Sequence, residues 1–530
     1  MSRRIIIIGV TLICCIIIMG FSFIINDNNN ENNNADKVAL PKSNIEEQYY
    51  AIKEVNQHVN LFTNFIDGYS ILIPDDLKVY MDSAGIRTVL KNDNMQIEIY
   101  KEDLKEGVSP ETYINYSNKF LENTVDHKKE YEQDLIMAGY NTHVVKWSRN
   151  KLSKVENDKN YYASLDMKIS NKVVFTFLFK SEKPFYSENQ YVDIVSSFYK
   201  KTSAGSYEKI ADKNILNNNI SENKNWNKET KEVYEKYFGE KSTLKWGIFE
   251  PSAPEDFTNL KNLENRIQYK FPFLVYYKHF NKDNDVSSLR KGLTNAAKEN
   301  RILELTLQTT SQEDGNMVYD ILNGEYDQFL DLFISEINEA KIPVLMRFCN
   351  EMNGDWCMYS SYHTSKDTEI FKQLYKYVYK KFEEKGASKY VIWVWNPNEK
   401  SLPDFKWNGE DMYYPGDEYV DVIGLTGYNT GTYYDAEKWR SFDEIYEIPY
   451  KKVLENYNKP IMITEFSSSS VGGNKEAWVL DMFDKIKNYD QIKVAIWWSG
   501  RDLDSDGSVA RPYWIDETEE LIDIFRKNLT

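Results

Sequence analysis

Cysteine is scarce in this sequence, and its scarcity limits how the chain can be held together. There are four cysteines in 530 residues, and two of them, Cys14 and Cys15, lie in an apolar run near the N-terminus. Only Cys349 and Cys357 lie beyond that run. The fold therefore does not rest on a framework of disulfides, although the spacing of these two residues permits one bridge.

Histidine is also scarce, which weakens two hydrolase chemistries. Of five histidines, His279 and His363 fall in the C-terminal part of the chain, and neither has the spacing of a zinc ligand or of a catalytic triad. The segment from Asp502 to Gly507 begins like a calcium loop, but its twelfth position is Tyr513 instead of a glutamate. The sequence implies neither a metal nor an organic cofactor.

Basic residues are fewer than acidic ones, 65 against 82, so the net charge is −17. Such a chain repels nucleic acids and anionic surfaces, and a neutral or cationic partner fits better. Aromatic residues make up 15% of the sequence, with 39 Tyr and 12 Trp. This content exceeds the needs of a core and provides rings that can line a cleft and stack on sugars.

Long hydrophobic runs are absent except at the N-terminus. Residues Ile5 to Ile25 carry no charge and are long enough to cross a membrane, and they follow Arg3 and Arg4. Bulky residues continue to the polar border, which favours an uncleaved signal anchor over a cleavable signal peptide. We expect residues 1–25 to anchor the chain in the membrane, with everything that follows on the extracellular face.

Two polar, Asn-rich segments divide the remaining chain. Residues 26–45 predict a spacer, and residues 204–240 predict a second linker. Between them, residues 46–203 contain short strand-like runs, beginning at Gly68, Met95 and Val173, mixed with helical patterns. These patterns predict a smaller α+β domain, whose role the sequence does not indicate.

Residues 241–530 alternate strand and helix repeatedly. Helical patterns separate several of the strands, and Gly386 stands where one of these helices should stop. Eight such units predict a (β/α)8 TIM barrel; a doubly wound sheet is the alternative, but no Gly-rich phosphate turn follows the first strand. The eight predicted strands begin at Trp246, Phe271, Leu303, Val344, Val391, Val422, Ile461 and Val494.

Two of these strands end in a glutamate, Glu351 after the fourth and Glu465 in the seventh. A carboxylate at the end of an apolar strand costs several kcal/mol unless it is paired or used. Catalytic sites of such barrels form at the strands' C-terminal ends, where two carboxyls about 5 to 5.5 Å apart perform retaining glycoside hydrolysis. The plainer interpretation is that each glutamate only forms an ion pair with Arg347. We would favour it for a single glutamate, but not for two glutamates at strand ends.

Further polar and aromatic residues near these strand ends are candidates for substrate binding. Tyr428 can hydrogen-bond a nucleophilic carboxylate, and Asn350 can bind a sugar hydroxyl or simply cap a turn. Four tryptophans are candidate stacking platforms, although one or two of them belong to the core. They are Trp356, Trp395, Trp497 and Trp498.

The run RFCNEMNGDW from Arg347, together with ITEF around Glu465, resembles the signature of glycoside hydrolase family 26, best known for β-1,4-mannanases. The resemblance covers about the last 290 residues, including the order of the strands. It implies that Glu351 is the acid/base and Glu465 the nucleophile. It also implies that Tyr428 supports the nucleophile and that Trp356 and Trp498 line sugar subsites.

One residue departs from the family pattern, because its mannanases usually have histidine where this chain has Asn350. We therefore expect an endo-acting β-1,4-glycanase whose backbone is glucan or mannan, or a self-made exopolysaccharide trimmed together with its synthesis machinery. The alternative is an inactive barrel that binds glycan or cell wall, with residues 46–203 as the recognition module.

Overall fold

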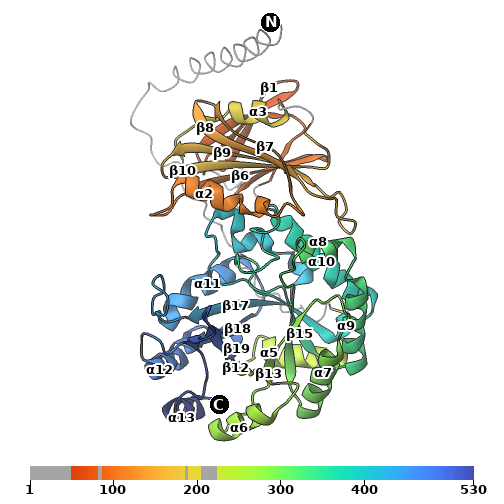
Figure 1. Ribbon diagram of the computed structural model, residues 1–530, viewed down its shortest axis with the longest axis vertical. Coiled ribbons are helices and arrows are strands. Elements are labelled where there is room, and N and C mark those ends of the chain that lie inside the picture. The colour runs from red at the N-terminus through yellow and green to blue at the C-terminus, as the bar shows by residue number, and fades with distance from the viewer. Residues whose placement is uncertain (1–48, 81–85, 186–188, 204–223, 530) are drawn as a thin grey trace. The chain divides into compact units, whose positions relative to one another are not determined.

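The computed structural model describes residues 49–80, 86–185, 189–203 and 224–529 (Figure 1). The predicted anchor and the first Asn-rich segment lie outside these ranges, so both remain predictions. Among the residues that are described, no helix is both long and apolar enough to cross a membrane.

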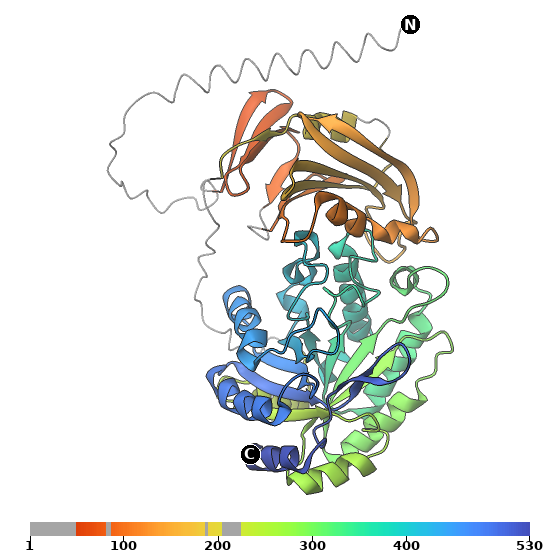
Figure 2. The ribbon, with the colours of Figure 1, turned by 60° about the vertical axis from the view of Figure 1, so that its left-hand side comes forward.

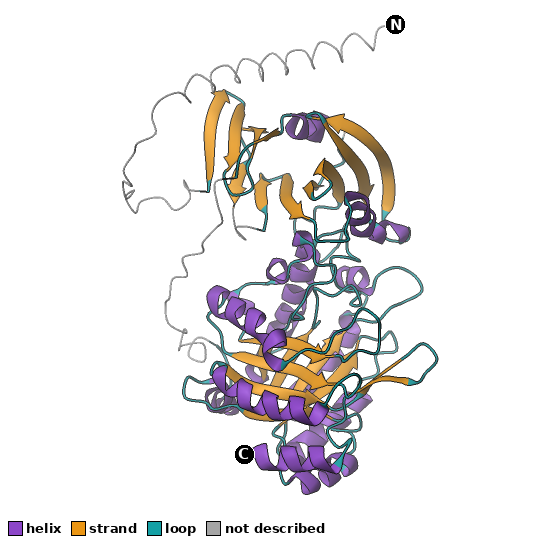
Figure 3. Ribbon diagram, turned by 90° about the vertical axis from the view of Figure 1, so that its left-hand side faces the viewer, coloured by secondary structure: helices purple, strands orange, loops and turns teal. Residues whose placement is uncertain are grey.

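The residues that precede the barrel form two β-sheets, with strand orders β1-β2-β3-β11 and β4-β5-β6-β10-β9-β8-β7 (Figure 3). Strands β3, β6 and β10 match the runs predicted from Gly68, Met95 and Val173. Helices α2 (Pro110–Ser117) and α3 (Asn189–Ser196) lie between these strands in the sequence. The strands are β1 (Tyr50–Asn56), β2 (Val59–Asn64), β3 (Tyr69–Pro74), β4 (Lys78–Tyr80), β5 (Thr88–Lys91), β6 (Met95–Asp103), β7 (Lys128–Met137), β8 (Tyr140–Ser148), β9 (Tyr161–Ser170), β10 (Val173–Ser181) and β11 (Tyr199–Lys200).

The C-terminal part forms a closed barrel of eight parallel strands, which confirms the predicted barrel (Figure 2). Apolar runs such as VLMRF and VIWVW are buried along their whole length, because the lumen covers one face and the helices cover the other. The strands are β12 (Lys245–Phe249), β13 (Phe273–His279), β14 (Ile302–Gln308), β15 (Val344–Phe348), β16 (Val391–Trp395), β17 (Val422–Asn429), β18 (Ile461–Ser468) and β19 (Ile492–Trp498).

Amphipathic helices alternate with these strands. Helix α10 (Thr368–Glu384) ends just before Gly386, whose φ of 73° permits the left-handed stop that the sequence predicts. Between β16 and β17 the chain forms short 3-10 turns in place of an α-helix. The other helices of the barrel are α6 (Thr258–Ile267), α7 (Ser287–Glu299), α8 (Met317–Asn323), α9 (Asp327–Ala340), α11 (Phe442–Asn456), α12 (Lys475–Lys485) and α13 (Glu519–Asn528).

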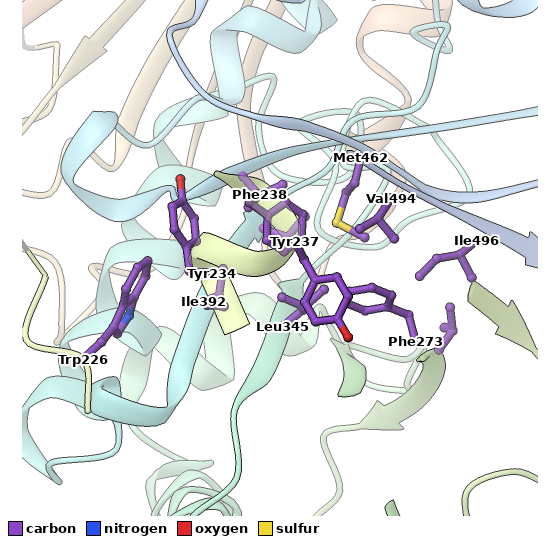
Figure 4. Packing of buried hydrophobic residues seen from close by; sticks show 13 residues of the cluster. Trp226, Tyr234, Tyr237, Phe238, Phe273, Leu345, Ile392, Met462, Val494 and Ile496 are labelled. Atoms are coloured by element: carbon purple, nitrogen blue, oxygen red, sulfur yellow. The ribbon is translucent and has the colours of Figure 1, made fainter. Parts of the chain in front are cut away.

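The N-terminal end of the barrel is closed by a helix that the sequence analysis placed in a linker. Helix α5 (Lys228–Phe238) buries Tyr234, Tyr237 and Phe238 against residues at the starts of the strands, such as Phe273 (Figure 4). Residues 204–240 are therefore not a linker throughout, because the amphipathic face of α5 completes the barrel core. The rest of the cluster comprises Trp226, Val275, Leu345, Ile392, Val394, Val422, Met462, Val494 and Ile496.

The boundary between the compact units also differs from the predicted one. Among the described residues, unit 1 contains those up to Lys101, Glu132–Val145 and those from 163 to 203. Unit 2 contains Glu102–Tyr131, Lys146–Tyr162 and the described residues from 224 onward. Two segments of the predicted 46–203 domain thus belong to the barrel unit.

Candidate active site

Glu351 lies in a turn after β15 whose backbone is unusual for residues with side chains. Cys349 and Glu351 have φ values of 49° and 54°, which cost about 1–2 kcal/mol each away from glycine. The turn is fixed because the Glu351 N–H donates to the Asn396 carbonyl at 2.7 Å and the Tyr359 hydroxyl donates to the Asn350 carbonyl at 2.6 Å. Strain of this kind is typical of functional sites.

Polar side chains surround the Glu351 carboxyl group. The Asn398 side chain donates to one oxygen, and Asn350 Nδ2 donates to the other at 3.4 Å. The indole N–H of Trp356 donates a further hydrogen bond. Burial, and then the negative charge of Glu465, raise the pKa of Glu351 to about 7 despite these bonds. The group can therefore carry a proton near neutral pH and still release it.

Glu465 lies within β18 and is only 5% exposed. Its Oε2 accepts hydrogen bonds from the Tyr277 hydroxyl and from Arg347 Nη2, the latter at 2.9 Å. Burial opposes the charge of Arg347, but Glu465 and Glu304 keep the pKa of this guanidinium well above its usual range. A permanent cation therefore stands beside the Glu465 carboxyl group.

Strand β14 carries a stripe of polar side chains that the sequence analysis missed: Glu304, Thr306 and Gln308 at every second position. Glu304 lies 2.7 Å from Arg347 Nε, Thr306 accepts from the same nitrogen at 2.9 Å, and Gln308 donates to Asn350 Oδ1 at 2.6 Å. Burial raises the pKa of Glu304 to about 8, although Arg347 acts in the opposite direction. The period-two polar pattern in an otherwise apolar strand was the available signal.

The hydrogen bond to Glu465 that the sequence suggested for Tyr428 is made by Tyr277, on β13. Burial and the charge of Glu465 raise the pKa of the Tyr428 phenol well above its usual range, so it stays neutral close to the carboxylate. Its ring packs against Tyr513 and Trp498, with centroid distances of 5.2 and 6.3 Å.

The tryptophans differ in what they can contact. Trp498 Nε1 donates to the Tyr277 hydroxyl at 3.2 Å, and Trp356 is 51% exposed beside Glu351. Trp395 is fully buried against Tyr414 and Tyr457, so the structure does not bring it to the site. Along its strand, Ile392 and Val394 point into the barrel, whereas Trp393 and Trp395 point outward. Trp497 is also buried. The predicted residues that do gather are Arg347, Asn350, Glu351, Trp356, Tyr428, Glu465 and Trp498.

The two cysteines of the barrel do not form a disulfide. Cys349 and Cys357 are both buried free thiols. Within the described ranges, no group of three or more His, Cys, Asp or Glu side chains is arranged to hold a metal ion.

The part of the chain that carries both glutamates is similar to known proteins. Residues 275–468 match the profile of glycosyl hydrolase family 26, a range that includes both glutamates. Endoglucanase H of Acetivibrio thermocellus is 32% identical over 184 residues, which cover 34% of this chain and 20% of that protein. A mannan endo-1,4-beta-mannosidase of Bacillus subtilis strain 168 is 28% identical over 193 residues, covering 32% and 48%. The matched part thus spans less than half of either relative.

Among solved structures, the catalytic domain of a Bacillus sp. JAMB-750 endo-beta-1,4-mannanase has a TM-score of 0.43 at 19% identity. The superposition covers 57% of this chain and 90% of that domain.

Proposed function

The barrel of this chain belongs to glycosyl hydrolase family 26, and from this premise we propose that the protein is an endo-acting hydrolase of a β-1,4-linked polysaccharide. One observation carries the proposal: two glutamates at one end of the barrel have opposite surroundings. Glu351 has a pKa raised to about 7, whereas Glu465 accepts hydrogen bonds from Arg347 and Tyr277. A protonated acid beside an ionised carboxylate is the pair that glycoside hydrolysis requires.

In the first half of the reaction, Glu465 attacks the anomeric carbon while Glu351 protonates the departing glycosidic oxygen. A covalent glycosyl-enzyme forms, and the sugar chain on the leaving side departs. Arg347 and Tyr277 orient the Glu465 oxygen that they contact, which leaves its other oxygen for the attack.

In the second half, Glu351 acts as a base. Esterification of Glu465 removes the negative charge that helps to raise the pKa of Glu351. The lower pKa suits deprotonation of a water molecule, which then attacks the anomeric carbon and releases the sugar with net retention. One residue thus performs both proton transfers because its neighbour changes charge.

The backbone that fits best is a β-1,4-glucan or a mannan. The relatives named above are an endoglucanase and a mannan endo-1,4-beta-mannosidase. Mannanases of this family usually have histidine where this chain has Asn350, whose side chain lies beside Glu351, so the proposal includes glucan as well as mannan.

The place of action is part of the same proposal. The charge-free run from Ile5 to Ile25 after Arg3 and Arg4 favours attachment to the membrane with the barrel outside the cell. An anchored hydrolase is well placed to trim a polysaccharide during export by the synthesis machinery. Digestion of the barrel by protease added to intact cells would support this placement, and full protection would contradict it.

Activity is tested by measuring reducing ends released by the full chain from carboxymethylcellulose, lichenan, glucomannan and galactomannan, with Glu465→Ala as the control. Turnover that is lost in the variant supports the hydrolase, and the polymer that is cleaved identifies the backbone. If neither protein cleaves any polymer but both bind one equally, the barrel is a glycan-binding module instead.

A further inference from the structure

Two loops at the catalytic end of the barrel supply side chains that contact Glu351. Loop A, residues 349–367 between β15 and α10, provides the indole of Trp356. Loop B, residues 396–421 between β16 and β17, provides the amide of Asn398. The position and hydration of the Glu351 carboxyl group therefore depend on both loops.

Loops A and B are also joined to each other. The Asn398 N–H donates to Asn353 Oδ1 at 2.8 Å, and the Asn408 side chain donates to the Asn353 carbonyl at 2.8 Å. Leu402 N–H donates to that same carbonyl at 2.8 Å. Because Asn353 is two residues after Glu351, a shift of loop B is transmitted directly to the turn that carries the carboxyl group.

Helix α2 contacts loop A through Tyr116. The Tyr116 hydroxyl donates to Asp355 Oδ2, and its ring lies 5.0 Å from that of Tyr362. Burial and the bond to Asp355 raise the pKa of the Tyr116 phenol well above its usual range, so it remains a neutral donor. On its other side, the Asp355 carbonyl lies 2.6 Å from His363 Nε2. Asp355, the neighbour of Trp356, is thus held at two points.

The same helix contacts loop B. Ser117 Oγ accepts a hydrogen bond from Trp407 Nε1 at 3.1 Å, and both side chains are buried. The ring of Tyr113 packs edge-on against Phe405 with centroids 4.7 Å apart. One short helix, more than 200 residues from Glu351 in the sequence, therefore contacts both loops within a single compact unit.

We propose that helix α2 is a positioning element for the acid/base, with Tyr116 and Ser117 holding loops A and B at the geometry that Glu351 requires. The proposal rests on the proposed hydrolase function and extends it to residues outside the region that matches the family profile. Neither residue touches the reacting atoms. Both act through Asp355 and Trp407.

Loosening either contact should alter the environment of Glu351 in a measurable direction. Burial is the largest contribution to its raised pKa, and a mobile loop admits water, so the pKa should fall toward its ordinary value. The lost bonds from Trp356 and Asn398 act in the opposite direction, and each of them contributes less than burial does. A misplaced acid also protonates the leaving group poorly.

The test compares three variants of the full chain: Tyr116→Phe, Ser117→Ala and, as a matched control, Tyr377→Phe. The control removes another tyrosine-to-aspartate bond, from Tyr377 to Asp327 on the outer helices. The Glu351 titration is followed by NMR of selectively labelled glutamate, assigned with Glu351→Gln, and kcat is measured against pH on the cleaved polymer.

For Tyr116→Phe and Ser117→Ala we expect a Glu351 pKa lower by about half a unit or more and a kcat lower by about tenfold. The alkaline limb of the pH profile should move down with the pKa, and Tyr377→Phe should match the wild type. Unchanged titration in both test variants would overturn the proposal. If the titration shifts but the wild type hydrolyses nothing, the hydrolase function fails and the positioning role stands. Ser117→Ala alone decides the matter if Tyr116→Phe does not fold.

Discussion

Glu351 and Glu465 lie at the same end of the barrel, yet their immediate contacts differ in kind. Glu465 receives bonds from a guanidinium and a phenol, whereas Glu351 receives them from two amides and an indole. Amides and indoles stabilise an anion less than a guanidinium does, and the pKa of Glu351 is raised despite them. In the proposed mechanism, these different neighbours distinguish the acid from the nucleophile.

The charge of Glu465 should be visible in the titration of Glu351. In Glu465→Gln the repulsion that helps to raise the pKa of Glu351 is absent, so this pKa should fall below about 7. NMR of labelled glutamate measures it directly, without any substrate. An equal or higher pKa in the variant would contradict the electrostatic coupling between the two carboxyl groups.

Gly354 should be needed to seat Trp356. A Cβ at position 354 would lie 2.4 Å from the indole ring, so the ring must move away. We expect Gly354→Ala to weaken the indole bond to Glu351 and to lower kcat/KM by about tenfold. Gly409→Ala is the control, since its nearest contact is 3.3 Å and no side chain is displaced. Activity assays on both variants make the comparison, and equal kcat/KM would argue against a role for Gly354.

At the scale of elements, strand β14 contributes more to the site than its apolar appearance indicates. Its inward positions support Arg347 and Asn350, which lie on β15 and just after it. Glu304 is the costly member of this stripe, because it is fully buried and both oxygens lack a hydrogen-bonded partner among the described side chains. Its ion pair with Arg347 only partly offsets that burial.

Stability should fall as pH rises, because of Glu304. Its pKa is raised to about 8 in the fold, so between its ordinary pKa and 8 the native state keeps a proton that the unfolded state has lost. The slope of the unfolding free energy against pH is then negative in that range. Glu304→Gln should make this slope less negative. Urea unfolding at pH 5 and pH 8 measures it, and identical slopes would contradict the prediction.

Sequence patterns predict the barrel well because each strand is an apolar run of limited length. Glu351 and Glu465 could be predicted because a carboxyl group that ends such a run is costly. Tyr277 and Trp395 could not be assigned, since a strand buried on both faces does not reveal which residues face the lumen. Helix α5 resembled a linker because polar, Asn-rich sequence precedes it and its apolar face is short.

At the scale of the whole molecule, residues far upstream of the barrel strands make buried hydrogen bonds to the barrel's loops. Trp147 donates to Ser365 at 3.3 Å, and Tyr162 donates to Asp367 Oδ2 at 3.0 Å. Both bonds are buried and lie within unit 2. Local sequence patterns do not reveal contacts between residues more than 200 positions apart. The predicted domain boundary therefore separated these partners.

The barrel alone should therefore be defective. Residues 224–530 lack the segments 102–131 and 146–162, which leaves the partners of Tyr116, Trp147 and Tyr162 uncovered. We expect this truncated chain to unfold at a lower temperature than residues 49–530 and to lose most of its activity. Thermal unfolding and reducing-end assays compare the two proteins. Equal stability and activity would mean that these early segments are dispensable.

The path of the chain through its two units has a consequence for how such a protein can change in evolution. The chain passes from one unit to the other after Lys101, Tyr131, Val145 and Tyr162, and again between residues 203 and 224. Recombination at the Asn-rich segment near residues 217–227, which looks like a natural joint, would transfer a barrel without its early segments. Hybrid proteins that receive only this barrel would be impaired, so the two units should be inherited together.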